Sequence, residues 1–378
     1  MPSMRVMFCT RAGAGHFGPL VPFAKAFLRN NDEVVFVAPA ESAAMIAGAG
    51  FDHELIPDPP QQGRAEMFAK ARQMDWNDAN VMVVRDMFVA MDTPANFPHV
   101  VNAIETHRPD VVLWEATDFA AALAAEATGV PAVCVGITQA SHREVLADVV
   151  DAALAEVRET LGLATREPDE APYFTLMPLE FEDPEAPGPP HALRFRERIA
   201  EARPLPDWWE NTEWPLVYLT LGSVAPTMDF FPGVYRDALD SLSHLPVRVL
   251  VTVGRDRDPA DLGPVGPNVH VARWVPQADV MPHTAAMICH GGSGTVRAGL
   301  AAGVPLAVLP LFADQPFNAR RVAELGAGVT LDRASRAGDA VRWLLADPAY
   351  RKAAQRVAAA TQRLPTVDRA VEIVRGLA

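Results

Sequence analysis

The chain has few cysteines and no long apolar run. Its three cysteines, Cys9, Cys134 and Cys289, each lie in or beside a short apolar run, which is typical of small buried thiols. No disulfide framework and no CxxC spacing of a metal site is present. The longest uncharged apolar stretch, between Arg297 and Asp314, is 16 residues long and is interrupted by two prolines. It is too short to span a bilayer.

Positive charge is also scarce. The 378 residues include 33 Lys and Arg against 47 Asp and Glu, a formal net charge of −14. Such a surface repels phosphate backbones and anionic lipid, so we expect no nucleic-acid partner and no membrane partner. A local site for a small anion remains allowed, and a homodimer is left open. The N-terminus runs directly into a strand-like segment without a signal-peptide pattern, which predicts a cytoplasmic protein.

Proline, in contrast, is abundant. Nine of the 34 prolines crowd residues 166–210, at positions 168, 172, 178, 184, 187, 189, 190, 204 and 206. This density predicts a connector without regular elements between two domains. We expect an N-terminal domain over residues 1–200, a C-terminal domain over 211–360, and a final helix over 361–378.

Short β-branched runs alternate with helical patterns on both sides of this connector. The alternation predicts an α/β protein with two Rossmann-like, doubly wound parallel-sheet domains facing across a cleft. A helix is expected close after Gly18, and a helical tail after about Arg333. Strands are expected at 5–10, 33–38, 111–114, 132–136, 216–221, 247–253, 269–272, 286–289 and 305–310. Ligands of such sheets bind at the carboxyl ends of the strands.

A glycine-lined loop after the first strand carries a histidine. The loop, Gly13–Gly18, reads GAGHFG and places His16 at a strand end, where an imidazole is suited to act as a general base. The same letters match the dinucleotide motif GxGxxG. That motif requires an acidic residue at the end of the second strand, but Ala38 and Pro39 stand there and Glu41 comes two positions late. A structural capping role for His16 is the other alternative.

A histidine base needs a carboxylate on its second ring nitrogen. Glu115 and Asp118 follow the strand expected at 111–114 and lie on the same rim as His16. Either could instead cap the next helix, and this alternative is stronger for Asp118. The sequence does not decide between the two carboxylates.

Three motifs in the second half suit a nucleotide diphosphate. The strand at 286–289 leads into HGGSGT (290–295), whose backbone N–H groups, helix start and His290 suit a phosphate. Trp274 in WVPQ can stack on a planar base, with the Val275 backbone free to bond its edge. ADQ (313–315) follows the next strand and offers acceptors for sugar hydroxyls. The alternative is a core tryptophan and an ordinary tight turn.

At these residues the sequence resembles the nucleotide-sugar-dependent glycosyltransferases of GT-B fold, in the bacterial natural-product branch of the UDP-glycosyltransferase superfamily. The resemblance implies an acceptor-binding first domain, a donor-binding second domain and a final helix that packs back on the first. It implies that His16 is the base of an inverting transfer, and Glu115 stands where the family usually has the partner acid of that base. The donor-binding residues that it implies are Ser223, Trp274, Val275, His290, Gly292, Ser293, Gly294, Thr295, Asp314 and Gln315.

One position departs from the resemblance. Where plant relatives carry a glutamate that grips both ribose hydroxyls, this chain has Arg297. A nucleotide without the 2′-hydroxyl loses less from this absence, so we expect a dTDP-deoxysugar donor rather than a UDP-sugar. The donor is a co-substrate, and no cofactor is expected. A DxD motif, Asp256–Asp258, matches metal-dependent sugar transferases, but it continues as a polar loop, so we expect no metal site.

The acceptor site is expected in the irregular region between Pro57 and Pro98. Methionines and aromatic residues gather there and suit a hydrophobic polyketide or aromatic aglycone. Their spacing fits ordinary core helices equally well. The candidate acceptor-binding residues are Met74, Trp76, Met87 and Phe88.

Three other functions remain compatible with these motifs. A sugar-nucleotide epimerase or hydrolase of the same fold would release products without an aglycone. An NAD-dependent oxidoreductase would use GAGHFG and bind a nicotinamide nucleotide instead of dTDP. A non-enzymatic helper of another transferase would not need both His16 and the complete HGGSGT and ADQ set.

Overall fold

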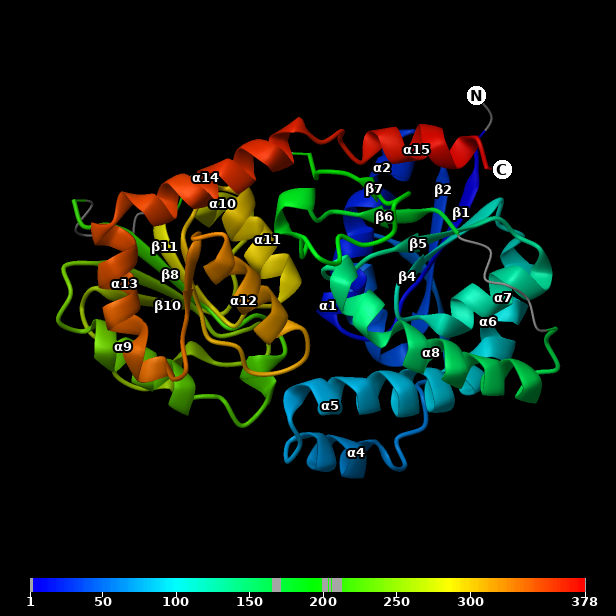
Figure 1. The fold of residues 1–378 in the computed structure, drawn as a ribbon, viewed down its shortest axis with the longest axis horizontal. Coiled ribbons are helices and arrows are strands. Elements are labelled where there is room, and N and C mark those ends of the chain that lie inside the picture. Colours follow the sequence, from blue (N-terminus) through cyan, green and yellow to red (C-terminus); the bar gives the residue numbers. More distant parts are fainter. Residues whose placement is uncertain (1–2, 165–170, 199–202, 204, 206–212, 378) are drawn as a thin grey trace. The chain divides into compact units, whose positions relative to one another are not determined.

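The computed structural model describes residues 3–164, 171–198, 203, 205 and 213–377. The chain divides into two compact units (Figure 1). The first unit comprises Met1–Leu176, Pro184–Arg198 and Pro365–Ala378, and the second comprises Met177–Asp183 and Ile199–Leu364.

The first unit is built on a seven-stranded parallel sheet of order β3-β2-β1-β4-β5-β6-β7. Its strands are β1 (Arg5–Cys9), β2 (Glu33–Pro39), β3 (Asp52–Ile56), β4 (Val111–Glu115), β5 (Ala132–Val135), β6 (Tyr173–Thr175) and β7 (Leu193–Arg194). Both faces are buried, because Val6 and Phe8 of β1 enter one hydrophobic cluster while Met7 and Cys9 enter another. This explains the nearly continuous apolar runs of its strands.

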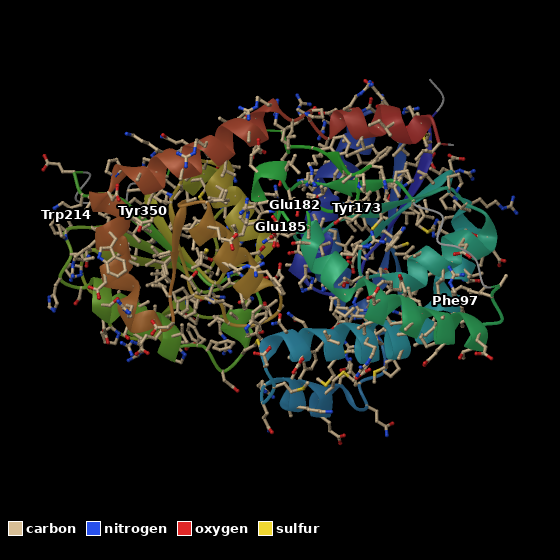
Figure 2. All side chains as sticks on the ribbon, viewed as in Figure 1. Phe97, Tyr173, Glu182, Glu185, Trp214 and Tyr350 are labelled. Carbon is tan, nitrogen blue, oxygen red and sulfur yellow. The ribbon has the colours of Figure 1, made fainter. Side chains whose placement is uncertain are left out.

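Helices cover both faces of this sheet. Among them, α15 packs beside α2 on the cluster that holds Phe8 (Figure 1), while α6 and α7 pack on the opposite cluster. Phe97 of α6 and Tyr173 of β6 both contribute to that second cluster (Figure 2). The helices are α1 (Ala14–Phe17), α2 (Val21–Arg29), α3 (Ala43–Gly48), α4 (Arg64–Ala71), α5 (Trp76–Met82), the π-helical η3 (Val83–Asp92), α6 (Thr93–His107), α7 (Phe119–Thr128), α8 (Ala140–Thr160) and α15 (Asp368–Arg375), with short 3₁₀ turns η1 (Gly18–Leu20) and η2 (Ala40–Ser42).

Two ion pairs anchor α15 within the first unit. The guanidinium of Arg375 lies 2.6 Å from the buried Asp32 carboxylate, and Arg29 of α2 lies 2.7 Å from Asp368. The apolar face of α15 enters the same cluster as β1. The last helix of the chain is therefore part of the first unit.

The second unit has a six-stranded parallel sheet of order β10-β9-β8-β11-β12-β13. The strands are β8 (Leu216–Thr220), β9 (Arg248–Thr252), β10 (Val269–Ala272), β11 (Thr284–Cys289), β12 (Leu306–Val308) and β13 (Gly328–Thr330). The helices are α9 (Gly233–Leu242), α10 (Gln277–Val280), α11 (Ser293–Ala301), α12 (Gln315–Glu324), α13 (Ala337–Ala346) and α14 (Pro348–Arg363), with 3₁₀ turns η4 (Leu179–Phe181), η5 (Ala225–Thr227), η6 (Pro259–Leu262), η7 (Met281–His283) and η8 (Ala334–Arg336). Tyr350 of α14 packs against one of the two clusters that sandwich this sheet (Figure 2).

The predicted fold class is confirmed, since each unit is a parallel sheet between helical layers. Each predicted strand is present with ends shifted by at most two residues, and the tail after Arg333 is helical. Four strands were not predicted: β3, β6, β7 and β13. They are edge or near-edge strands of two to five residues, too short to show a clear period.

The prediction that residues 166–210 lack regular elements is wrong for the described part, 171–198. The strands β6 and β7 form there and extend the first sheet. The prolines are compatible with this because they stand at element ends: Pro172 precedes β6 and offers only its carbonyl to Cys134, and Pro178 caps η4. Pro168, Pro204 and Pro206 lie outside the described residues.

Among the described residues, no helix combines the length and the apolar composition that crossing a membrane requires.

Candidate active site

A histidine and a glutamate meet at the carboxyl edge of the first sheet. β1 and β4 are parallel neighbours, so the loop after β1 and the last residue of β4 reach the same edge. Gly13 has φ 108°, a conformation that favours glycine, and it starts the short helix α1 that carries His16. The Nδ1 atom of His16 lies 3.1 Å from Oε1 of Glu115. Glu115 is fully buried, whereas the imidazole is 22% exposed.

Hydrogen bonds keep Glu115 ionised. Thr117 donates to its carboxylate twice, from the backbone N–H at 2.8 Å and from the hydroxyl at 2.9 Å. Burial by itself would raise the pKa of Glu115, but His16, Arg11 and the Thr117 backbone hold that pKa below its ordinary value. An ionised carboxylate only accepts, so Nδ1 of His16 carries the proton that it donates. Nε2 of His16, which has no partner among the described residues, is then free to accept a proton.

Asp118 has a different position and charge state. Its carboxylate caps α7 by accepting from the Ala121 backbone N–H at 3.2 Å. Burial, and next the negative charge of Glu115, raise the pKa of Asp118 to about 7. In the structure, Glu115 therefore forms the hydrogen bond with His16, and Asp118 caps α7.

An ion cluster beside His16 is absent from the sequence-based prediction. Asp92, at the end of η3, accepts from Arg11 at 2.5 Å and from Arg64 at 2.9 Å. The guanidinium of Arg11 lies 3.7 Å from the centre of the Phe88 ring, which in turn meets the His16 ring edge-on at 6.0 Å. No local pattern in the sequence pairs residues that are 81 and 28 positions apart.

The predicted acceptor residues occupy three different places in the first unit. Phe88 is half-buried beside His16. Met87 is buried within η3, 2% exposed. Met74 and Trp76 are half-buried, in the α4–α5 connection and at the start of α5. The structure therefore brings Phe88 to the histidine and places Met87 within η3, Trp76 on α5 and Met74 in the connection before α5.

The second unit presents the glycine-rich turn between β11 and α11. Gly292 caps α11, and Gly294 lies in its first turn, where an α-helix leaves backbone N–H groups without helical partners. Thr295, in the same turn, donates its own N–H to the Gly292 carbonyl at 3.0 Å. His290 follows the last residue of β11 and is packed so closely that a Cβ at Gly222 or Gly292 would lie 2.6 or 2.4 Å from its ring. Burial lowers the pKa of His290 to about 4, so the imidazole is neutral at pH 7. Its buried Nδ1 has no partner among the described residues.

A hydrogen-bond network joins this turn to the start of α12. Asn318, fully buried, donates to the Gly291 carbonyl at 2.8 Å, to Asp314 at 2.9 Å and to Ser293 at 3.1 Å. The Ser293 hydroxyl donates to Asp314 at 2.7 Å. Asn318 was missed from sequence because it lies three residues beyond the ADQ motif, where its type alone carries no signal.

Gln315 is buried beneath the turn that precedes α12. Its side-chain oxygen accepts from the backbone N–H groups of Leu311 and Phe312 at 2.8 and 3.0 Å. Only the amide NH₂ of Gln315 is left over from these two bonds. Asp314 and Gln315 thus both shape the turn that was predicted to hold sugar hydroxyls.

Trp274 is not a core residue, and that alternative is wrong. Half of its side-chain surface is exposed, and the Arg255 guanidinium lies 3.9 Å from the centre of its ring. An exposed indole offers a flat apolar face of the kind on which nucleobases stack. Val275 is half-buried beside it, and Ser223 is exposed after β8.

The DxD segment lies in a loop after β9. Asp258 caps η6 and lies 3.3 Å from Arg273, and Arg257 donates to the Pro226 carbonyl at 2.7 Å. Within the described ranges, no group of three His, Cys, Asp or Glu residues is arranged to hold a metal ion.

Comparison with known proteins finds that the chain is similar to antibiotic glycosyltransferases. Residues 236–377 match the family described as "Erythromycin biosynthesis protein CIII-like, C-terminal domain". The elloramycin glycosyltransferase ElmGT of Streptomyces olivaceus is 29% identical, over 96% of this chain and 94% of ElmGT.

Solved glycosyltransferase structures superpose on this chain over nearly its full length. The glycosyltransferase SnogD of Streptomyces nogalater superposes with a TM-score of 0.81 at 27% identity, over 100% of this chain and 99% of SnogD. The Streptomyces sp. SF2575 glycosyltransferase SsfS6, complexed with thymidine diphosphate, superposes with a TM-score of 0.79 at 24% identity, over 99% of each chain. The two units therefore have the GT-B fold.

Proposed function

Because this chain is a GT-B-fold homologue of bacterial antibiotic glycosyltransferases, we propose that it transfers a sugar from a nucleotide-sugar to a hydroxyl of a hydrophobic natural product. The first unit binds the acceptor, and the second binds the donor. The observation that carries the proposal is the His16–Glu115 hydrogen bond, which prepares a base at the edge of the first sheet.

In the proposed reaction His16 is the general base. Its Nε2 takes the proton of the acceptor hydroxyl, and the buried charge of Glu115 stabilises the imidazolium that forms. The acceptor oxygen attacks the anomeric carbon from the side opposite the nucleotide diphosphate. The sugar is therefore transferred with inversion.

The second unit supports departure of the diphosphate. The start of α11 directs backbone N–H groups and the positive end of a helix dipole at the developing negative charge. His290, held neutral by burial, adds an N–H donor rather than a cation. These groups stabilise the leaving group by themselves, so we propose that the reaction needs no metal.

The donor is proposed to be a dTDP-sugar rather than a UDP-sugar. Trp274 stacks on the thymine. Arg297 stands in place of the glutamate with which plant relatives bind both ribose hydroxyls, so a nucleotide without the 2′-hydroxyl loses less binding. The SsfS6 complex with thymidine diphosphate supports the same nucleotide. The name of ElmGT, an elloramycin glycosyltransferase, supports a natural-product acceptor.

The test is replacement of the base. His16→Ala is expected to lower the transfer rate by on the order of 10²–10⁴, because general-base catalysis is lost. Transfer from dTDP-glucose to the hydroxyanthraquinone alizarin is followed by product analysis, which also separates transfer from donor hydrolysis or epimerisation.

His99→Ala is the matched control, since His99 is an exposed histidine of α6 in the same unit. It is expected to keep the wild-type rate. A folded His16→Ala protein, judged by circular dichroism, that turns over at the wild-type rate contradicts the proposal.

A further inference from the structure

A buried ion cluster ties three segments of the first unit together. The side chain of Asp92 is fully buried, and each of its two oxygens accepts from a different arginine: Oδ2 from Arg11 and Oδ1 from Arg64. The side chains of Arg11 and Arg64 are 9% and 15% exposed. A carboxylate this deeply buried depends on both partners, because an unpaired buried charge is costly.

The three residues come from separate elements. Arg11 follows β1 in the loop that leads to His16, Arg64 is the first residue of α4, and Asp92 is the last residue of η3. The α4–α5 pair, which Figure 1 shows side by side, has little apolar attachment of its own. No residue of α4 is buried, and Met82 is the single buried residue of α5. The Arg64–Asp92 pair is thus the tether at the start of this segment.

The tether reaches the proposed base through Phe88. The ring of Phe88, one turn before Asp92, lies under the Arg11 guanidinium and against the edge of the His16 ring. A shift of η3 would therefore move the surface that His16 faces. Arg11 also faces Glu115 and Asp118, whose pKa values it lowers, so its charge is shared among three carboxylates. Arg64 supplies the second positive charge that Asp92 needs.

We propose that Asp92 and Arg64 are positioning residues that hold residues 64–92 against the His16 loop and thereby determine which acceptors the site takes. This inference rests on the proposed function, in which His16 is the base and the first unit binds the acceptor. It identifies the Arg64–Asp92 ion pair as a contact on which acceptor selection depends.

The experiment uses the full chain with one substitution at a time. Arg64→Met removes the charge, keeps the aliphatic stem and leaves Arg11 as the ion-pair partner of Asp92. Circular dichroism checks that the variant is folded before either readout. Arg64→Lys restores a positive charge. Arg85→Met is the matched control, because Arg85 lies on η3 and makes an exposed ion pair with Asp86 at 2.5 Å.

The first readout does not depend on activity. Hydrogen exchange of the backbone amides in residues 64–82 is expected to be about tenfold faster in Arg64→Met than in the wild type, because the buried pair no longer opposes opening. Arg64→Lys is expected to restore most of the protection, and Arg85→Met to keep it. Unchanged hydrogen exchange in Arg64→Met overturns the proposal that the Arg64–Asp92 pair tethers this segment.

The second readout is steady-state transfer from dTDP-glucose to alizarin. Arg64→Met is expected to raise KM for alizarin about tenfold, with kcat and KM for dTDP-glucose within about twofold of wild type. Faster exchange with an unchanged KM for alizarin overturns the role in acceptor selection. Failure of the proposed function is separate, since it appears as wild-type turnover by His16→Ala, while the exchange result decides the tether by itself.

Discussion

At the residue scale, two carboxylates three positions apart have pKa values shifted in opposite directions. Glu115 accepts hydrogen bonds from the backbone N–H and the hydroxyl of Thr117 and from His16, and its pKa is held low. Asp118 receives one backbone hydrogen bond and faces the charge of Glu115, so its pKa is raised to about 7. Because two buried negative charges this close repel each other, one carboxylate is ionised at the expense of the other.

This difference predicts how stability depends on pH. Since the pKa of Asp118 is about 7 when folded and near 3.8 when unfolded, the folded state binds the extra proton between these values. Its contribution to stability is fully present below pH 3.8 and is lost as the pH rises through 7. Asp118→Asn keeps the capping oxygen and removes the titration. Between pH 5 and pH 8, wild type is expected to lose about 2 kcal/mol more unfolding free energy than the variant.

Urea unfolding at the two pH values measures this effect. Asp75→Asn is the control, because Asp75 also caps a helix, α5, but is exposed. Its pH dependence is expected to match that of wild type. Equal losses in wild type and Asp118→Asn would mean that Asp118 is ionised at pH 5 in the folded protein.

At the element scale, two strand–turn–helix units of the second sheet share one asparagine. β11 leads through the glycine-rich turn into α11, and β12 leads through the 309–314 turn into α12. Asn318 of α12 donates to both turns, since its partners include the Gly291 carbonyl and Asp314. The shape of the proposed diphosphate site therefore depends on a residue that is itself fully buried.

Asn318→Ala is expected to weaken dTDP binding about tenfold and to lower the free energy of unfolding by about 1–3 kcal/mol, because buried acceptors lose their donor. Titration calorimetry and urea unfolding provide the two values. Asn268→Ala is the control: the Asn268 amide donates at 2.8 Å to the Val247 carbonyl, at the opposite ends of the strands. This control variant is expected to lower the free energy of unfolding without changing the affinity for dTDP. Equal dTDP affinity in both variants would refute a role for Asn318 in shaping the turn.

At the scale of the whole molecule, the net charge of −14 constrains how the proposed donor site can hold a diphosphate. HGGSGT contains no lysine or arginine, and His290 is neutral at pH 7. The available groups are backbone N–H donors and the start of α11, which bind an anion without adding a formal charge. An acidic protein can in this way bind one small anion while its surface repels large ones.

The proposed donor site, with Arg297 in place of a ribose-binding glutamate, predicts a preference for dTDP over UDP that thermal shift can measure. dTDP is expected to raise Tm more than UDP at equal concentration, and a ligand at a hundredfold excess over its Kd contributes about 2.7 kcal/mol. The same shift is expected in excess EDTA, since backbone donors and His290 need no metal. A larger shift with UDP, or loss of the dTDP shift in EDTA, would contradict the proposed donor site.

The sequence by itself determined the two parallel-sheet domains, most of their strands, and the positions of His16, Trp274 and the glycine-rich turn. These features are encoded locally, because the alternation of apolar residues and the glycines at strand ends are visible within about ten residues. Local sequence patterns did not predict the short strands β6 and β7. These strands form because the edge of the sheet offers hydrogen-bond partners.

Only the tertiary structure decided which groups interact. It paired Glu115 rather than Asp118 with His16 across 99 positions, joined Asp92 to Arg11 across 81, and brought Asn318 to Gly291 across 27. Such partners depend on strand order and on the burial of each carboxylate, and neither property is contained in a local stretch of sequence. The sequence therefore supplied the chemical groups, and packing at the sheet edges set their pairing and their charge.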